Sequence, residues 1–402
     1  MSGRQGIRAG LTGLALIAAA AAPEDAGAQA RVPTRVCAGG DVTLGTDLDT
    51  AFARTQSARL RPYGVSPDPQ VLLEPLRTLF ADADIVLLNV ETAIGSGPFR
   101  SKCGPRSTSC YAFRAPPSAA PALRALGHDS AVVVGNVANN HARDAGHPGL
   151  RSTIEHLHSA NVLVTGLDTI ATPVPLPSGD TVGILGFYTS TETPDVRDLG
   201  AVRRHVARAA GQYRTVIVTA HMGAEGIGAQ RTRDTVEHFL SSRIHRGNPV
   251  GFARAAFEAG AAFVVGHGPH VLRAAEWSDD RLALYSLGNL LTFGPFNNAE
   301  PINRGVVACA DLQDGRVVGA HLRPTVQLAP GVLRPDPSLR AMTLIDSLSA
   351  LDFPATGARV DVWGELRRLP PVVLSESIPP AFAPPADSMR ADTSRVPPRR
   401  PR

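Results

Sequence analysis

Five short segments of the sequence place potential metal ligands directly after apolar, β-branched runs. The ligands are Asp41 in GGDVTLG, Asn89 and Glu91 in NVET, Asn139, Asn140 and His141 in ANNHARDAG, His221 and Glu225 in AHMGAEG, and His267 and His270 in GHGPH. In layered α/β folds, ligands bind beyond the carboxyl ends of the strands, where the loops converge. Mixed carboxylate, amide and imidazole donors suit borderline divalent ions such as Mn, Zn or Fe. The pattern therefore predicts a centre for one or two divalent metal ions.

Each of these signals has an ordinary structural explanation when it is taken alone. An Asp after two glycines is commonly a turn or capping residue, and an Asn-Asn pair is commonly a turn. A single His is more often a hydrogen-bonded surface or core residue than a ligand, and Glu91 after an apolar strand could simply meet solvent. The metal-centre hypothesis therefore depends on all five segments ending at the same edge of the fold.

Short β-branched runs alternate with helical patterns through most of the chain. Strands are predicted at 36–38, 85–90, 131–134, 162–165, 182–187, 215–219, 262–265, 282–286 and 306–308, the last of which closes the series, and helices at 72–80, 119–126, 150–157, 202–210, 252–258 and 342–351. This alternation is typical of a layered α/β fold. We expect one domain over residues 31–354, followed by a C-terminal extension at 355–375.

The two ends of the chain differ from its body. Arg4 and Arg8 precede an apolar stretch at 9–22 and small residues at 26–30, a pattern typical of a signal peptide over residues 1–30. The apolar stretch is shorter than the ~20 residues that span a bilayer, and an uncleaved anchor is the alternative interpretation. Residues 376–402 carry paired prolines and a terminal RRPR, which predict an extended, disordered tail. We expect a protein exported to the periplasm or the cell exterior.

The net charge of +4 invites a nucleic-acid or membrane-surface function. Part of this excess lies in the 376–402 tail, where five Arg residues oppose three acidic residues. The body is therefore close to neutral, and no basic groove for nucleic acid is predicted.

Four cysteines in an exported chain are compatible with two disulfides. Cys103 and Cys110 bracket a short loop rich in Gly, Pro and Ser, and we expect a bridge between them. Cys37 and Cys309 each lie in an apolar, strand-like run, where buried free thiols are the prediction.

Seven blocks of the sequence resemble the bacterial capsule-synthesis family CapA, which is linked to poly-γ-glutamate and belongs to the calcineurin-like metallophosphoesterase superfamily. The blocks appear in family order over about residues 35–350, and they are GGDVTLG, ADADIVLLNVETAIG, YAFRAPP, ANNHARDAG, AHMGAEG, GHGPHVLR and LALYSLGNLLTF. The resemblance implies a layered α/β/β/α sandwich of the metallophosphoesterase type.

The resemblance also gives each candidate ligand a role. It implies that Asp41 holds the first metal, that Glu91 takes the place of a bridging aspartate, and that Asn140 ligates the second metal. His141 would act on the leaving group, and His221, His267 and His270 would complete the two coordination spheres. The expected substrate contacts are Asn89, Asn139, Glu225 and Asn289, with turn stabilisation as the alternative for Asn289.

The sequence departs from the superfamily pattern at three places. The superfamily's Asp-x-His is Asp41-Val42-Thr43 here, so one histidine ligand is missing. Its Gly-Asp motif becomes Asn-Val-Glu, and its Gly-His-x-His is one residue longer, so that only one of His267 and His270 need ligate. The number of metal ions therefore stays open at one or two.

Charged residues near the blocks have two interpretations each. Arg143 and Asp144 either orient His141 or hold an anionic substrate, whereas helix capping is the favoured role for Asp144. Three arginines near the expected disulfide loop either collect a polyanion or form a solvated surface, which is the favoured interpretation. They are Arg100, Arg106 and Arg114.

Two functions fit the site and the resemblance. The favoured one is an exported, metal-dependent hydrolase of a phosphoester, or of an amide or ester bond in an anionic envelope polymer. The alternative is a non-catalytic accessory that binds poly-γ-glutamate or a similar polymer during capsule assembly or export, with membrane proteins of that assembly as candidate partners. A purely structural metal has no need of an Asn-His pair, and this favours catalysis.

Overall fold

The computed structural model describes residues 32–45, 48, 50–104, 110–239, 243–293 and 298–369. The predicted signal peptide at 1–30 and the predicted tail at 376–402 lie outside these residues. Within the described part of the chain, no helix combines the length and the apolar character needed to cross a membrane.

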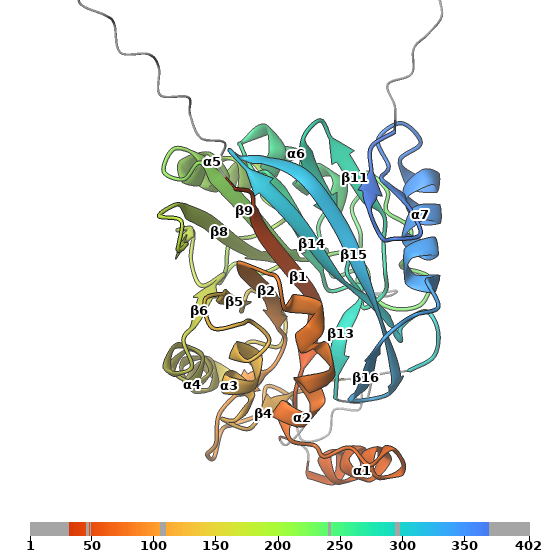
Figure 1. The fold of residues 1–402 in the computed structure, drawn as a ribbon. Helices are drawn as coiled ribbons and strands as arrows, with labels where there is room; N and C mark the ends of the chain where they lie inside the picture. The colour runs from red at the N-terminus through yellow and green to blue at the C-terminus, as the bar shows by residue number, and fades with distance from the viewer. Residues whose placement is uncertain are drawn as a thin grey trace, which may run out of the picture.

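The larger of two sheets has eight strands in the order β16-β15-β14-β1-β2-β5-β6, with β13 pairing the end of β1 (Figure 1). Its parallel strands are β1 (Thr34–Thr43), β2 (Ile85–Val90), β5 (Val132–Asn136), β6 (Val162–Thr165) and β13 (Asn289–Thr292). Antiparallel strands β14 (Arg304–Gln313), β15 (Arg316–Ala329) and β16 (Val332–Pro335) extend it on the other side of β1.

The smaller sheet has six strands in the order β11-β12-β10-β9-β8-β7. Strands β8 (Thr181–Tyr188), β9 (Thr215–His221), β10 (Phe263–His267) and β12 (Arg281–Leu284) are parallel, and β7 (Thr172–Pro175) and β11 (Ala275–Ser278) are antiparallel edges. Two short ladders stand apart from both sheets: β3 (Ala93–Ile94) with β4 (Arg114–Ala115), and β17 (Arg359–Val360) with β18 (Leu366–Arg367).

The two sheets pack face to face, and helices cover their outer faces. Successive strand residues point to opposite faces, so Val36 and Ala38 lie in the core between the sheets while Cys37 lies in the core beneath the helices. On the larger sheet these helices are α2 (Pro69–Leu73), α3 (Ala119–Arg124) and α4 (Gly146–Ser159). Helices α5 (Leu199–Ala210) and α6 (Pro249–Glu258) cover the smaller sheet, and α7 (Arg340–Asp352) packs along the sandwich edge (Figure 1). The layered α/β/β/α sandwich is therefore confirmed.

The structure corrects three of the predicted elements. The strand series does not close at 306–308, because β14 is followed by β15 and β16, whose outward-facing Arg, His and Pro residues hide the strand pattern. The helix predicted at 72–80 is split into α2 and a 3₁₀ helix, Glu74–Phe80, since Pro75 lacks the amide proton that an α-helix needs there. Helix α1 (Thr50–Leu60) was not predicted.

Both pairs of cysteines form disulfides. The expected loop bridge joins Cys103 and Cys110, whose Cα atoms are 5.6 Å apart. A second, cross-strand bridge joins Cys37 on β1 to Cys309, which lies directly opposite on β14. The prediction of free thiols was wrong because the sequence pattern assigns each cysteine to a strand without showing that the two strands are neighbours.

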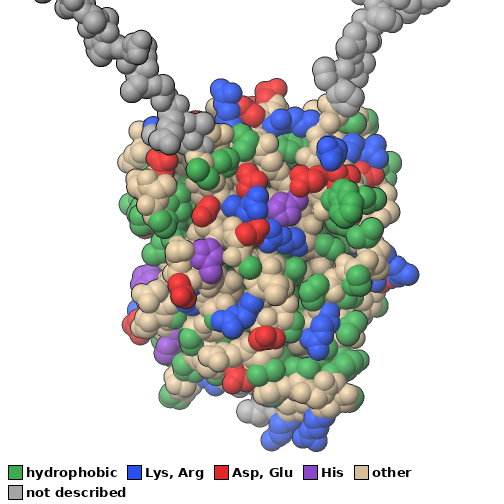
Figure 2. Space-filling view, in the orientation of Figure 1, with side chains coloured by type: hydrophobic (Ala, Val, Ile, Leu, Met, Phe, Trp, Pro, Cys, Tyr) green, Lys and Arg blue, Asp and Glu red, His purple; other side chains and the backbone are tan. Residues whose placement is uncertain are grey.

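Arginines and acidic side chains alternate on the molecular face that carries β14 and β15 (Figure 2). Arg35 pairs with Asp82 and with Asp311 at 2.7 Å, and Arg323 also pairs with Asp82 at 2.7 Å. Among the described residues on this face, the positive charges are therefore interspersed with negative ones rather than collected in a basic stripe.

Candidate metal centre

A row of polar side chains crosses the larger sheet at the carboxyl ends of its parallel strands. Asp41 on β1 lies in register between Asn289 on β13 and Asn89 on β2, and Asn89 pairs with Asn136 on β5. Asp41 lies within β1 rather than after it, because Gly40 lets the neighbouring chain approach closely. A Cβ at Gly40 would lie 2.1 Å from the carbonyl oxygen of Gly288.

A second row crosses the smaller sheet and faces the first. Tyr188 on β8, His221 on β9 and His267 on β10 are lateral neighbours at the ends of their strands. His267 Nδ1 lies 3.8 Å from Asp41 Oδ1, and His221 Nδ1 lies 3.1 Å from Asn89 Nδ2. The carboxyl ends of the two sheets therefore enclose one buried polar cluster.

Asn89 ties the two rows together. Its Nδ2 donates to Asp41 Oδ1 at 2.8 Å, and its Oδ1 accepts from Asn136 at 3.0 Å and from Asn139 at 3.2 Å. Asn89 and Asn139 are both buried, and their hydrogen bonds go to protein partners beneath the candidate ligands. The Asn89 amide thus fixes the orientation of Asp41. The Asn139 amide fixes the following turn, because its Oδ1 accepts a hydrogen bond from the backbone amide of His141.

Glu91 follows β2 and projects into the cluster without a hydrogen bond. Both of its carboxylate oxygens are buried and unpartnered among the described residues. Its Oε1 lies 3.7 Å from His221 Nε2 and 3.9 Å from His141 Nε2. These separations are too long for hydrogen bonds. They are near the roughly 3–3.5 Å that separates two ligand atoms of the same metal ion when each metal–ligand bond is about 2.1 Å long.

The His267–His270 turn brings both histidines to Asp41. Gly268 has φ 105° and His270 has φ 58°, and this left-handed backbone reverses the chain within the motif. His270 Nδ1 then lies 3.0 Å from Asp41 Oδ2 and 3.0 Å from Asn289 Oδ1. Ligand atoms of Asp41, Glu91 and His270 all fall within 4.8 Å of one another.

Burial and mutual charge shift the pKa values of the acidic groups and His270. Burial, reinforced by the charge of Asp41, raises the pKa of Glu91 well above its usual range. Burial alone would raise the pKa of Asp41, but the hydrogen bond and charge of His270 hold it below its usual value. Burial opposes charging of His270, yet the nearby Glu91 and Asp41 carboxylates raise its pKa to about 10.

Burial lowers the pKa values of the other three imidazoles. Burial lowers the pKa of His267 to about 4, and burial together with the charge of Arg246 lowers that of His221 far below its usual value. Burial also lowers the pKa of His141 despite the neighbouring Asp144. Neutral imidazole is the form that binds metal ions, so an ion bound at His270 would displace its proton.

The unpartnered atoms of this cluster test whether a metal ion fits. Buried polar atoms are nearly always hydrogen-bonded, and an unsatisfied one costs about 1–3 kcal/mol. Here several converge with no partner among the described residues: both oxygens of Glu91, Oδ1 of Asn140, Nε2 of His221 and both ring nitrogens of His267. All are metal-ligand atom types, and together with Asp41 and His270 they fit a divalent ion.

His141 is held by Asp144 at the edge of the cluster. His141 Nδ1 lies 2.7 Å from Asp144 Oδ2, and the imidazole packs 4.4 Å from the Phe113 ring. The helix-capping interpretation of Asp144 was wrong, because α4 begins at Gly146 with Ala145 as its N-cap. Asp144 instead accepts bonds from His141 and from the backbone amide of Phe113.

Arg246 is a residue of the site that sequence patterns did not single out. It is 3% exposed, its Nε donates to Gly223 O, and its Nη2 pairs with Glu225 Oε1 at 2.6 Å. Glu225 Oε2 lies 3.9 Å from His270 Nε2, and Arg246 packs over the Tyr188 ring. A fixed positive charge therefore stands beside the ligand cluster, and no motif around Arg246 would have revealed it.

Among the remaining charged candidates, Arg114 and Arg143 are half-buried and engaged by other partners. Arg143 pairs with Glu192 at 3.0 Å, and Arg114 donates to Gly97 O and stacks on Phe99. Arg100 is exposed, and Arg106 lies outside the described residues.

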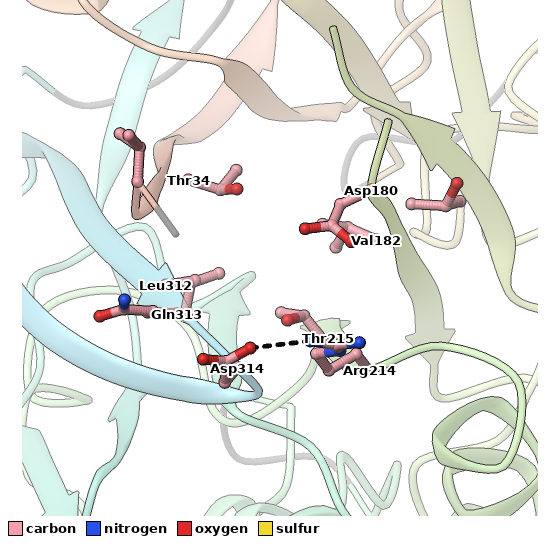
Figure 3. Close-up of a pocket in the computed structure, with 10 residues that line it drawn as sticks. Thr34, Asp180, Val182, Arg214, Thr215, Leu312, Gln313 and Asp314 are labelled. Atoms are coloured by element: carbon pink, nitrogen blue, oxygen red, sulfur yellow. Dashed lines mark hydrogen bonds and ion pairs between the residues drawn. The ribbon is translucent and has the colours of Figure 1, made fainter. Parts of the chain in front are cut away.

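A small cavity lies far from this chemistry, at the opposite ends of the strands (Figure 3). Its volume is about 30 Å³, room for about one water molecule, and it is lined by Thr34, Asp180 and the Arg214–Asp314 ion pair. Thr34 begins β1, and the seven residues from there to Asp41 span roughly 23 Å at about 3.3 Å each. The cavity is therefore separate from the ligand cluster.

The fold and this cluster define a layered α/β protein with a candidate metal centre at the carboxyl ends of its strands. The chain belongs to the bacterial capsule synthesis protein family PGA_cap, whose model matches residues 35–293. It is 27% identical over 172 residues to the PGA biosynthesis protein CapA of Bacillus subtilis (strain 168), a match that covers 39% of this chain and 41% of the relative. The match thus spans about two fifths of that relative's length.

A solved structure is also similar, the protein TT1561 of Thermus thermophilus. It has a TM-score of 0.34 and 10% identity, covering 71% of this chain and 97% of that one.

Proposed function

We propose that this protein is an exported, metal-dependent hydrolase that cleaves a phosphoester or γ-glutamyl bond in an anionic polymer of the cell envelope. The observation that carries the proposal is the set of buried, unpartnered ligand atoms that converges from both sheets. A family of capsule synthesis proteins supports the polymer as the substrate class.

Six side chains would hold one or two divalent ions such as Mn, Zn or Fe. They are Asp41, Glu91, Asn140, His221, His267 and His270. When bound, such an ion supplies Lewis acidity and lowers the pKa of the water that it holds.

His141 is the group placed to move a proton. Its Nδ1 is engaged by Asp144, which leaves Nε2 directed toward Glu91 and the cluster. A protonated His141 would give the Nε2 proton to the departing oxygen or nitrogen as the scissile bond breaks. Arg246 adds a buried positive charge near His221, and it is paired there with Glu225.

Two disulfides support the exported location, since such bridges persist in oxidising compartments. The alternative function is a non-catalytic accessory that binds the polymer during assembly or export. The printed name of the B. subtilis relative, a biosynthesis protein, favours this alternative.

Metal loading and hydrolysis by the full chain test the proposal. We expect Mn or Zn to activate cleavage of bis-p-nitrophenyl phosphate or of a γ-glutamyl anilide. For a substrate with a poor leaving group, such as the γ-glutamyl anilide, His141→Ala should lower kcat about 100-fold while metal content is kept, because a positioned acid contributes about 10²–10⁴-fold. His158→Ala, an exposed histidine on α4, is the matched control and should retain activity.

Two results would contradict the hydrolase. One is a metal-loaded protein that cleaves neither substrate. The other is cleavage of a poor leaving group that His141→Ala leaves intact. Binding of poly-γ-glutamate that survives chelation, without any cleavage, would establish the accessory function instead.

A further inference from the structure

Lys102 is the only lysine in a chain with 40 Lys and Arg residues, and it reaches the turn that carries His141. Its Nζ lies 2.6 Å from Asp144 Oδ1 and donates to the carbonyl oxygen of Asn140 at 2.9 Å. Its backbone amide also donates to Asp144 O at 2.8 Å. Its Nζ lies 3.5 Å from His141 Nδ1 as well, so four contacts attach one residue to the Asn140–Asp144 turn.

A second arm reaches the same carboxylate from the other side. The backbone amide of Phe113 donates to Asp144 Oδ2, the oxygen that also contacts His141 Nδ1. Lys102 precedes Cys103, and Phe113 follows Cys110, so the loop bridge ties the two arms together. The two segments joined by this disulfide therefore contact both carboxylate oxygens of Asp144: Lys102 contacts Oδ1 and the Phe113 amide contacts Oδ2.

The burial of Asp144 makes these partners necessary. Its side chain is 0% exposed, whereas the Lys102 side chain is 30% exposed. Removing one partner of a buried ion pair leaves an uncompensated charge and strongly destabilises the local structure. Without Lys102, the turn that holds Asn140 and His141 loses both its ionic contact and a hydrogen bond to its first carbonyl.

We propose that Lys102 and the Cys103–Cys110 bridge form a clasp that holds the Asn140–Asp144 turn in its working position, with the bridge acting through Lys102. The kinetic part of this proposal rests on the proposed hydrolase function, in which His141 protonates the leaving group. Lys102 is a positioning residue here, since it contacts Asp144 and the Asn140 backbone rather than the substrate. Its side chain and both half-cystines are partly exposed, so the clasp is open to mild reductants. The cross-strand bridge is buried and is not.

Hydrogen exchange of the turn amides tests the clasp without any activity. The reporters are the amides of His141, Asp144 and Gly146, which bond to Asn139 Oδ1, His141 O and Arg143 O. We expect Lys102→Met, and separately a Cys103→Ser/Cys110→Ser variant, to speed their exchange on the order of 10-fold. The combined variant should be no faster than the larger single effect, because both changes open the same clasp.

Two controls separate the clasp from general loosening. Arg151→Met changes an exposed basic residue on α4 and should leave exchange of the turn unchanged. Lys102→Arg keeps a cation and several donors and should restore most of the protection. Mild reduction of the wild-type loop bridge should reproduce the Cys103→Ser/Cys110→Ser result, which covers the case in which that variant folds poorly.

Kinetics with aryl phosphodiesters of graded leaving-group pKa test what the clasp does for His141. We expect Lys102→Met to lower kcat on the order of 10-fold for poor leaving groups and little for p-nitrophenol, with KM unchanged. A loss of equal size for every leaving group would overturn the positioning role.

The two readouts fail separately. Unchanged exchange in Lys102→Met, or effects of Lys102 and the bridge that multiply, would overturn the clasp. If the combined variant exchanges no faster than the faster single variant, and the protein cleaves no ester, the clasp would be supported and the hydrolase function overturned.

Discussion

We expect Glu91→Gln to be more stable than wild type without metal, by a margin that grows as pH rises. With metal bound, we expect the variant to gain less stability than wild type. Glu91 is completely buried with neither oxygen hydrogen-bonded among the described residues, so its charged form has no compensation until an ion is present. Gln has the same shape without the charge.

The size of the effect follows from proton linkage. Burial and Asp41 raise the folded-state pKa of Glu91 well above the 4.5 of the unfolded chain. The contribution of Glu91 to stability is thus full below pH 4.5 and is lost as pH rises toward the folded pKa. Between 4.5 and the raised folded-state pKa, the folded state holds more of this proton than the unfolded state, and each pH unit in that range removes up to about 1.4 kcal/mol of unfolding free energy. Glu91→Gln does not undergo this loss, so its advantage over wild type should grow by that amount.

Urea unfolding with chelator at pH 5 and 6, and again with Zn or Mn, measures both parts. At a free metal concentration of about 100 Kd, the wild type should gain about 2.7 kcal/mol, and Glu91→Gln clearly less. Glu258→Gln changes a largely exposed carboxylate paired with Arg203 and is the control. If the wild type and Glu91→Gln show equal pH dependence without metal and equal gains with it, the reasoning about this carboxylate is refuted.

Two further predictions concern the framework of the site. Gly40→Ala should lower the unfolding free energy by about 2–4 kcal/mol in urea titrations, because its Cβ would meet Gly288 O at 2.1 Å. Gly319→Ala is the control and should be nearly neutral, since the nearest contact of its Cβ would be at 3.5 Å. Equal effects of the two substitutions would contradict the close approach of the chains at Asp41. Replacing the cross-strand disulfide by alanines should lower the unfolding free energy by roughly 5–6 kcal/mol, and replacing the loop disulfide should lower it by roughly 2 kcal/mol. The difference follows from the closed loops of 272 and 7 residues. Urea titrations measure both values, and a larger loss for the loop disulfide would contradict the prediction.

The sequence was sufficient to predict the layers of the fold and most of the strands that carry ligands. The strand Ile85–Val90 and the strand Val162–Thr165 begin and end as predicted, because short apolar runs rich in β-branched residues favour a buried strand. The antiparallel extension by β15 and β16 was missed, since their partly exposed strands carry polar residues on one face.

The candidate ligands could be predicted because each follows an apolar run whose strand end is fixed. The residues that support them could not, because their partners are distant in sequence. The sequence around these supporting residues shows no motif, and only the folded structure shows what they contact. They are Asn136, Lys102 and Arg246. The same reason explains the cross-strand bridge, whose cysteines are 272 residues apart.

Direct metal binding by the chelator-stripped full chain is the most immediate test of the central claim. Equilibrium dialysis against Mn, Zn or Fe should show one or two bound ions per chain, with at least one lost in Asp41→Asn and none lost in Asp314→Asn, whose carboxylate is exposed and paired with Arg214. A wild-type chain that binds none of these ions, or an Asp41→Asn chain that binds them as well as wild type does, would contradict a metal centre at the ends of these strands.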